Sequence, residues 1–275
     1  MHKFAFMCYN SSMTRISNIK QNHLITLNLL ANQLSVGNVL TSEWLKQHGI
    51  SAKLAWWYMH SGWLERIGRE VYKKTNSNVT WGSAVAAIQS QLNLPVHVGG
   101  KTALEILGMA HFVPVGGLKR VILFAKHGTK LPKWLFDESV WDVKFNMYQP
   151  LLFTSYEKGV ERVVDNNKIL ISPPELAILE VLHLVPSQES FEGASLLMQG
   201  LAFLRPSVVQ HLLESCRSIK AKKLFLHLAS IYQHKWLNDL DLTKVFLGSG
   251  KCVVDGGGSY DGRYKISVPV LDKGY

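Results

Sequence analysis

Four consecutive residues, Gly99-Gly100-Lys101-Thr102, have the side chains found in phosphate-binding loops. Such a loop surrounds phosphate with backbone N–H groups and needs another glycine five residues before Gly100. Pro95 occupies that position. The segment is therefore expected to be a strand-to-helix turn. Its helix start remains a candidate anion-binding site, made of Gly99, Gly100, Lys101 and Thr102.

Acidic residues give little support for metal-dependent chemistry, which needs paired carboxylates. Asp142-Val143-Lys144 has the spacing of the end of a nuclease ligand set, but no acidic residue lies between Glu105 and Asp137 to supply the first ligand. Gly248-Ser249 suggests a nucleotidyltransferase, yet the Asp239-Leu240-Asp241 pair precedes it instead of following it. Histidines on the expected helices lack a His or Cys at i+3 or i+4. The sequence predicts no metal, no cofactor and no catalytic residue, and so a protein that is not an enzyme.

Basic side chains indicate a different chemistry. The chain has 275 residues, with 30 Lys and Arg against 20 Asp and Glu, a net charge of +10. The first 75 residues hold nine basic and three acidic side chains, a net of +6, so more than half of the excess lies in about a quarter of the chain. A basic N-terminal segment favours a polyanionic partner such as duplex DNA. A merely solvated surface is the alternative.

The elements around these basic residues have a recognisable order. Apolar spacing predicts helices over 17–33, 41–48 and 51–61, and two short strands, 63–67 and 70–74, around Gly68-Arg69. This order, with two helices, a tight turn, a third helix and a hairpin, is typical of a winged helix-turn-helix. We expect a flexible arm over 1–16, a winged helix-turn-helix domain over 17–75 and a larger mixed α+β domain over 79–275. The fold class is α+β.

In a helix-turn-helix the second helix enters the major groove. On the 51–61 helix, Leu54, Trp57 or Tyr58, and Ser61 are expected to face inward. The residues predicted to contact DNA lie on the outer face of this helix and on the hairpin: Ser51, Lys53, Trp56, His60, Arg66, Arg69, Lys73 and Lys74. Trp56 offers one donor and an apolar face, so it is expected to pack on sugar or backbone.

The larger domain alternates between short strand-like runs and helices. Strands are expected at 96–98, 112–115, 120–125, 141–147, 161–164, 168–171, 245–246, 251–254 and 264–270, and helices at 81–91, 101–107, 175–185, 190–202, 206–216 and 220–236. Ser172 is expected to cap the 175–185 helix, with Glu175 reaching back to it. Three scattered cysteines and the lack of a long uncharged apolar run predict a cytoplasmic protein without a membrane partner.

Several runs carry a family resemblance. These runs are the segment 41–54, the run 61–69 (SGWLERIGR) with Val71-Tyr72-Lys73-Lys74, and the run 97–108 (HVGGKTALEILG). The chain resembles the AbiEi antitoxin family of abortive-infection systems over about Ser17 to Pro269. The resemblance implies a bacterial antitoxin for phage defence. Its winged helix would repress its own operon at inverted repeats in double-stranded DNA, and its C-terminal domain would neutralise a nucleotidyltransferase-type toxin.

Two other functions stay open from the residues alone. One is an enzyme that its winged helix targets to DNA, a nuclease or a nucleotide-handling activity at the 99–102 turn or at Asp142. The other is a transcriptional regulator whose C-terminal pocket binds a small molecule.

Overall fold

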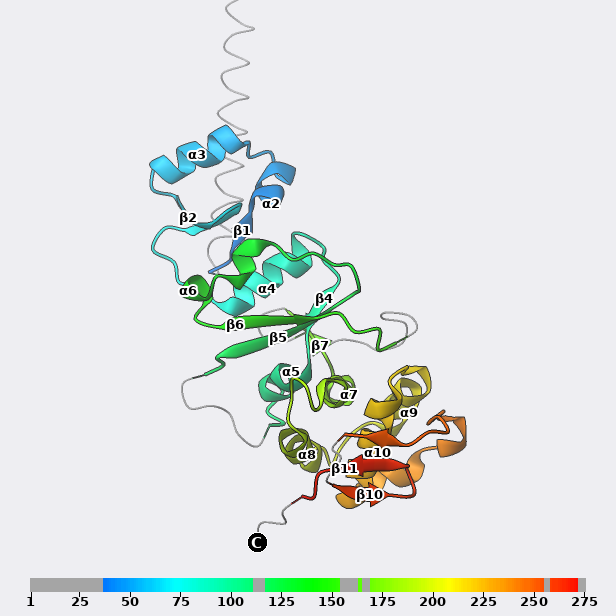
Figure 1. Cartoon of the computed structure of the whole chain (residues 1–275). Helices are drawn as coiled ribbons and strands as arrows, with labels where there is room; N and C mark the ends of the chain where they lie inside the picture. Colours follow the sequence, from blue (N-terminus) through cyan, green and yellow to red (C-terminus); the bar gives the residue numbers. More distant parts are fainter. Residues whose placement is uncertain (1–36, 111–116, 154–162, 165–168, 255–257, 272–275) are drawn as a thin grey trace, which may run out of the picture. The chain divides into compact units, whose positions relative to one another are not determined.

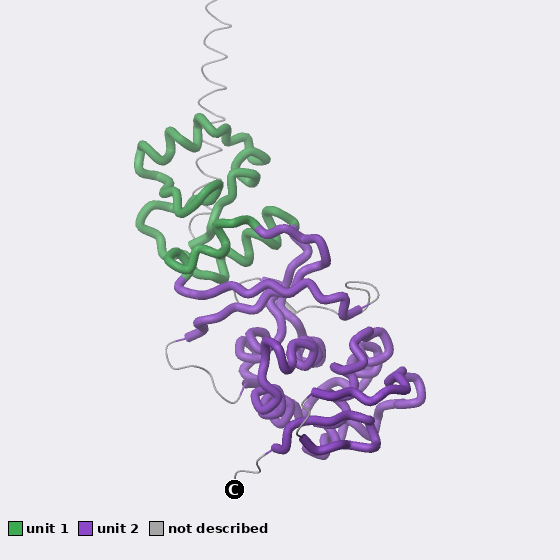
Figure 2. Tube along the Cα trace, viewed as in Figure 1, with its two compact units in different colours: residues 1–93, 132–141 green, residues 94–131, 142–275 purple. Residues whose placement is uncertain are grey.

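A computed structural model describes residues 37–110, 117–153, 163–164, 169–254 and 258–271. The described chain forms two compact units, each containing helices and strands (Figure 1). Unit 1 comprises residues 1–93 and 132–141, and unit 2 comprises residues 94–131 and 142–275 (Figure 2). The predicted helix over 17–33, the arm over 1–16 and the strand over 112–115 lie outside the described residues.

Unit 1 is built from short elements around one apolar core. Its described elements are β1 (Leu40–Thr41), α2 (Ser42–Gln47), α3 (Ala52–His60), β2 (Leu64–Gly68), β3 (Val71–Lys74), α4 (Trp81–Ser90), the 3-10 helix η1 (Lys133–Phe136) and α6 (Glu138–Trp141). The strands form an antiparallel sheet in the order β1-β3-β2. The core consists of Leu40, Trp44, Leu45, Ile50, Ala55, Tyr58 and Leu64.

Local signals explain the two central helices of this unit. Thr41 caps α2, its side chain accepting a hydrogen bond from the Trp44 N–H at 3.1 Å, and Ser51 caps α3 in the same way from the Leu54 N–H at 3.2 Å. Gly49, with φ of +78°, makes the tight turn between them. Both predicted helices are confirmed to within one residue at each end.

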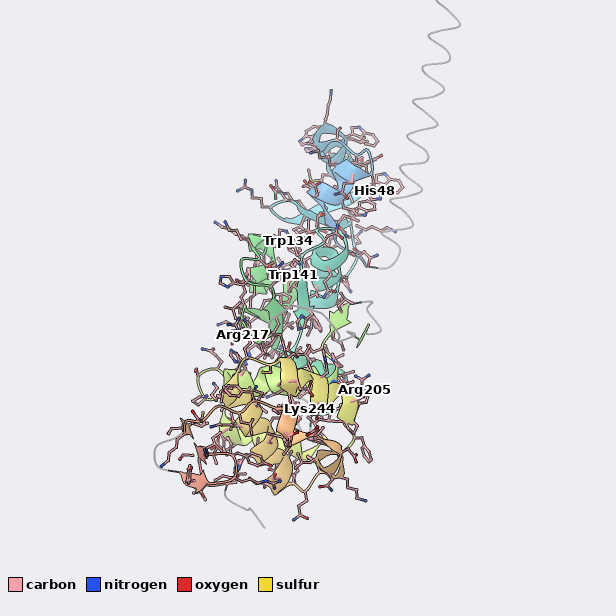
Figure 3. All side chains as sticks on the ribbon, turned by 90° about the vertical axis from the view of Figure 1, so that its right-hand side faces the viewer. His48, Trp134, Trp141, Arg205, Arg217 and Lys244 are labelled. Atoms are coloured by element: carbon pink, nitrogen blue, oxygen red, sulfur yellow. The ribbon has the colours of Figure 1, made fainter. Side chains whose placement is uncertain are left out.

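The predicted division at residues 75–79 differs from the compact units. Unit 1 continues through α4 and takes in residues 132–141. The physical reason is tertiary: the Gln91 side chain donates to the Val39 carbonyl at 2.7 Å and accepts from the Thr41 N–H at 2.9 Å. Within the returning segment Trp134 and Trp141 lie side by side (Figure 3), with the Trp141 indole N–H donating to the Trp134 carbonyl at 3.0 Å. This segment lies against the end of β2, where a Cβ added to Gly68 would lie 3.1 Å from Trp134 Cβ.

Unit 2 contains a five-stranded mixed sheet in the order β6-β5-β4-β8-β7. Its strands are β4 (Val96–Val98), β5 (Arg120–Ala125), β6 (Lys144–Tyr148), β7 (Val163–Val164) and β8 (Leu170–Ile171). Helices α5 (Gly100–Ile106) and α7 (Pro174–Leu184) lie together along this sheet (Figure 1). β5 is antiparallel to β4 and parallel to β6.

In the rest of unit 2, three helices pack against α7: α8 (Phe191–Gln199), α9 (Pro206–Ser215) and α10 (Ile219–Ile231). The other described elements are the 3-10 helices η2 (Lys235–Asp239) and η3 (Leu242–Lys244), and the strands β9 (Cys252–Val253), β10 (Ser259–Asp261) and β11 (Ile266–Val268). The last three strands form a sheet in the order β10-β11-β9. Lys223 of α10 anchors this sheet region, donating to the Gly250 carbonyl at 2.6 Å.

Several details of the predicted elements were wrong. Residues 141–143 are not strand, because Trp141 ends α6 and β6 begins at Lys144. The pair 245–246 is not a strand, and β10 was not among the predicted strands. Ser172 does not cap α7; its hydroxyl instead donates to Glu180, and Pro173 occupies the cap position. Glu175 binds Arg205 and does not reach back to the helix start.

Candidate DNA-binding surface

The solvent face of α3 is the first part of the candidate surface. Ala55 and Tyr58 are buried, and Leu54 packs against the same core from its edge. Lys53, Trp56, Trp57 and His60 are exposed, at the i, i+3, i+4 and i+7 spacing of one helix face. Of the predicted inward set, Tyr58 is confirmed, whereas Trp57 and Ser61 are exposed because the helix turns Ala55 and Tyr58 inward.

The hairpin β2–β3 is the second part. Leu64 pairs with Lys74, Glu65 with Lys73 and Arg66 with Tyr72, and a bulge follows between Arg66 and Gly68. The bulge places the turn at Arg69-Glu70, where Glu70 adopts φ of +66°. The turn is one residue further along the chain than the predicted one.

The cations of the hairpin are partly paired. The Lys73 ammonium lies 3.3 Å from the Glu65 carboxylate, and its side chain is only 20% exposed. Arg69 is 87% exposed and lies 3.9 Å from Glu70. Arg66 donates from Nε to the Gly68 carbonyl at 3.1 Å, while its side chain stays on the surface. Sequence reasoning did not consider these acidic partners. Arg66, Arg69 and Lys74 are the cations of the hairpin whose side chains are most exposed to a partner.

The 99–102 turn has the predicted position between β4 and α5 but already binds a carboxyl group of the same chain. The Gly100 N–H donates to Glu180 Oε2 at 2.8 Å, and the Gly99 N–H donates to the Ile122 carbonyl. Thr102 Oγ1 accepts from the Ile122 N–H at 3.1 Å. The exposed Lys101 lies 3.9 Å from Glu105. The N–H groups of Gly99 and Gly100 and the Thr102 hydroxyl are thus engaged within the fold.

Glu180 is the buried group that sequence reasoning missed. Its Oε1 lies 2.7 Å from His97 Nε2, and its Oε2 also accepts from the Ser172 hydroxyl at 2.9 Å. His97 and Glu180 line a mostly apolar pocket of about 170 Å³, together with Phe124, Leu152 and Leu176. No local spacing pattern joins residues 97 and 180, so only the fold reveals the pair.

Asp142 is a surface residue. Its side chain is 92% exposed, and its carboxylate lies 3.3 Å from the Lys119 ammonium. Among the described residues, no group of three or more His, Cys, Asp or Glu side chains has an arrangement that could hold a metal ion. No described helix is long and apolar enough to span a bilayer.

Two family models match successive parts of the chain. Residues 23–115 match one described as "Transcriptional regulator, AbiEi antitoxin N-terminal domain", and residues 118–269 match one described as "Transcriptional regulator, AbiEi antitoxin, Type IV TA system". No curated protein matches the chain.

Solved structures with a similar fold include one from a mycobacterium. The crystal structure of the RV2827C protein from Mycobacterium tuberculosis is 13% identical in sequence and aligns with a TM-score of 0.58. The alignment covers 86% of this chain and 89% of that one. At this identity the likeness concerns the fold alone.

Proposed function

This chain belongs to the AbiEi family, the antitoxins and transcriptional regulators of type IV toxin–antitoxin systems, and we propose that it binds duplex DNA through a winged helix-turn-helix. The family consists of regulators and antitoxins, not of enzymes. In the proposed module α2 and α3 are the helix-turn-helix, α3 enters the major groove, and the β2–β3 hairpin is the wing.

One observation carries this proposal. Two neighbouring elements of unit 1 expose cations together: Lys53 on the outer face of α3, and Arg69 at the tip of the hairpin. The Ser51 hydroxyl accepts a hydrogen bond as the cap of α3, and its own hydrogen remains suited to donate to a phosphate at the helix start. Arg66 and Arg69 suit an adjacent minor groove, since narrow grooves attract arginine.

The resemblance extends the proposal to the whole operon. We propose that the protein represses its own promoter at inverted repeats, with two copies on the DNA, and that unit 2 supports neutralisation of a nucleotidyltransferase-class toxin. Both tasks would be carried out in the cytoplasm.

A titration of the promoter fragment of its own operon tests the DNA-binding proposal. Fluorescence anisotropy at 50 to 200 mM salt should give an affinity that falls steeply with salt, because binding releases counterions from the phosphates. Lys53→Ala and Arg69→Ala should each weaken binding and lower the salt slope by about 1. Lys235→Ala removes an exposed cation from η2 in unit 2 and is the charge-matched control. Affinity that is negligible or insensitive to salt would overturn the proposal.

Growth after co-expression with the toxin of the same operon tests the antitoxin role. Wild type should restore growth, and Asp142→Ala should restore it equally, because Asp142 is an exposed partner of Lys119. Loss of rescue by a folded Asp142→Ala protein would instead favour chemistry at Asp142.

A further inference from the structure

Helix α3 exposes an unusually apolar face for a helix proposed to meet DNA. Trp56 and Trp57 are 54% and 51% exposed, beside the exposed Lys53 and His60. An exposed helix face normally carries charged or amide side chains, and grouped exposed aromatic side chains indicate an interaction surface. On this face, only Lys53 has the several donors that suit a guanine edge.

The ring of Trp56 is held in place before any partner binds. It stacks on the imidazole of His60 one turn later, with ring centroids 3.7 Å apart and planes 29° apart. His60 is itself fixed, since its Nδ1 lies 2.9 Å from the Trp56 carbonyl oxygen. The side chain therefore lies along the outer face of α3 as a fixed apolar plate, which reduces the entropy lost when it packs against a partner.

The chemistry of the major groove limits what such a plate can recognise. An indole has one N–H donor and no acceptor, so it cannot make the bidentate contacts that arginine makes to guanine or asparagine makes to adenine. The apolar group on a base edge in this groove is the 5-methyl of thymine. We infer that Trp56, held by His60, recognises a thymine methyl in each operator half-site.

This inference rests on the proposed DNA binding and specifies what α3 reads. It differs from the expectation that Trp56 packs on sugar or backbone, and it is favoured by the position of the stacked ring on the outer face of α3, with Lys53 and Trp57 on the same face. A consequence is that each half-site contains at least one thymine whose 5-methyl group contributes to the affinity of the protein.

Replacing thymine by deoxyuridine, one position at a time, tests this inference directly. Uracil pairs with adenine as thymine does but lacks the methyl group. For the wild-type protein, one position in each half-site should lose about fourfold in affinity, the value expected for one buried methyl-sized group. Trp56→Ala should bind the thymine operator more weakly and should no longer distinguish uracil from thymine at that position.

A second tryptophan provides the matched control. Trp63 is similarly exposed, at 47%, but precedes β2 and does not lie on α3, so Trp63→Ala should keep the uracil sensitivity. Circular dichroism should confirm that both variants are folded.

The outcomes separate the two proposals. Salt-dependent operator binding with no uracil-sensitive position would overturn the Trp56 inference and leave the proposed function standing. A position that stays sensitive in Trp56→Ala would also overturn it, because another side chain would make the contact. Absence of operator binding by the wild type would overturn the proposed function.

Discussion

At the scale of single residues, Glu180 joins three segments of unit 2. Its carboxylate binds His97 of β4, the Gly100 N–H at the start of α5 and the Ser172 hydroxyl before α7. A buried carboxylate is tolerated where donors surround it, and here both oxygens have partners. The cluster thereby fixes the strand-to-helix turn whose glycines first suggested a phosphate site.

Gly99 lies against this cluster and should not tolerate a side chain. A Cβ added there would lie 2.3 Å from Glu180 Oε2 and 2.6 Å from the Phe124 ring. Gly99→Ala should therefore lower the free energy of unfolding by about 1–3 kcal/mol, as overpacking of a core does. Gly250→Ala is the control, because nothing lies within 4 Å of its added Cβ. Urea denaturation of the two variants gives the comparison, and equal midpoints would contradict this role of Gly99.

The Glu175–Arg205 pair should make stability depend on pH. Burial raises the pKa of Glu175, but the hydrogen bonds and charge of Arg205 outweigh it and leave that pKa below its ordinary value. A carboxylate with a lowered pKa stabilises the fold above its unfolded pKa, about 4.3, and this stability is lost as pH falls through the folded pKa. Arg205→Gln should cost about 1–3 kcal/mol at pH 7, since it removes donors from a buried acceptor.

The cost of Arg205→Gln should shrink on acidification, since protonation relieves the unpaired carboxyl group. Chemical denaturation at pH 7 and pH 4 measures the difference. Arg217→Gln is the control: Arg217, labelled in Figure 3, is exposed, and its side chain makes no hydrogen bond or ion pair with another described residue, so its change should cost little at either pH. A pH-independent cost for Arg205→Gln would contradict the role assigned to Glu175.

At the scale of elements, the sequence predicts those whose signals are local. The caps at Thr41 and Ser51 place α2 and α3, and the apolar run at 96–98 places β4. The start of β6 was missed because Trp141 fits a strand pattern while its indole N–H is bound to the Trp134 carbonyl within unit 1. For the candidate site, the pattern predicts which residues are basic and exposed, but not the pairing of Lys73 with Glu65.

Two substitutions at Ser51 should separate the capping of α3 from its proposed contact with DNA. Ser51→Ala removes the acceptor for the Leu54 N–H and should cost about 1 kcal/mol of stability. Ser51→Asp keeps a capping oxygen, so stability should be retained, but its charge should repel a nearby phosphate and lower operator affinity. Thermal denaturation and anisotropy titration are the two measurements. Operator affinity unchanged in Ser51→Asp would place the phosphate away from the start of α3.

At the scale of the whole molecule, unit 1 is assembled from two separate stretches of chain. Residues 132–141 return to it after the chain has built β4, α5 and β5 of unit 2. The polar composition of residues 75–78 suggested that the first domain ends there. A polar run shows where the chain leaves one element, but it does not show which later segment packs on that element. Long-range packing of this kind is not visible in local spacing.

Hydrogen exchange should reveal this assembly as cooperative unfolding. Leu45 is buried in the unit 1 core, so Leu45→Ala should lower the stability of that unit by about 2–5 kcal/mol. Amides of α4 and of residues 132–141 should then exchange faster together, while those of β5 and α7 keep their protection. Mass spectrometry of peptic fragments provides the measurement. Faster exchange in α3 with unchanged exchange in residues 132–141 would contradict the assignment of that segment to unit 1.

The bulge of the hairpin at Gly68 has a practical consequence for domain transplantation. A methyl group added at Gly68 would lie 3.1 Å from Trp134 Cβ, so the hairpin meets a segment that is more than sixty positions away along the chain. A chimaera that borrows only the first ninety or so residues would carry the hairpin without its support. A donor graft that also supplies the piece around Trp134, joined by a short artificial connector, is the better unit to move between transcriptional regulators.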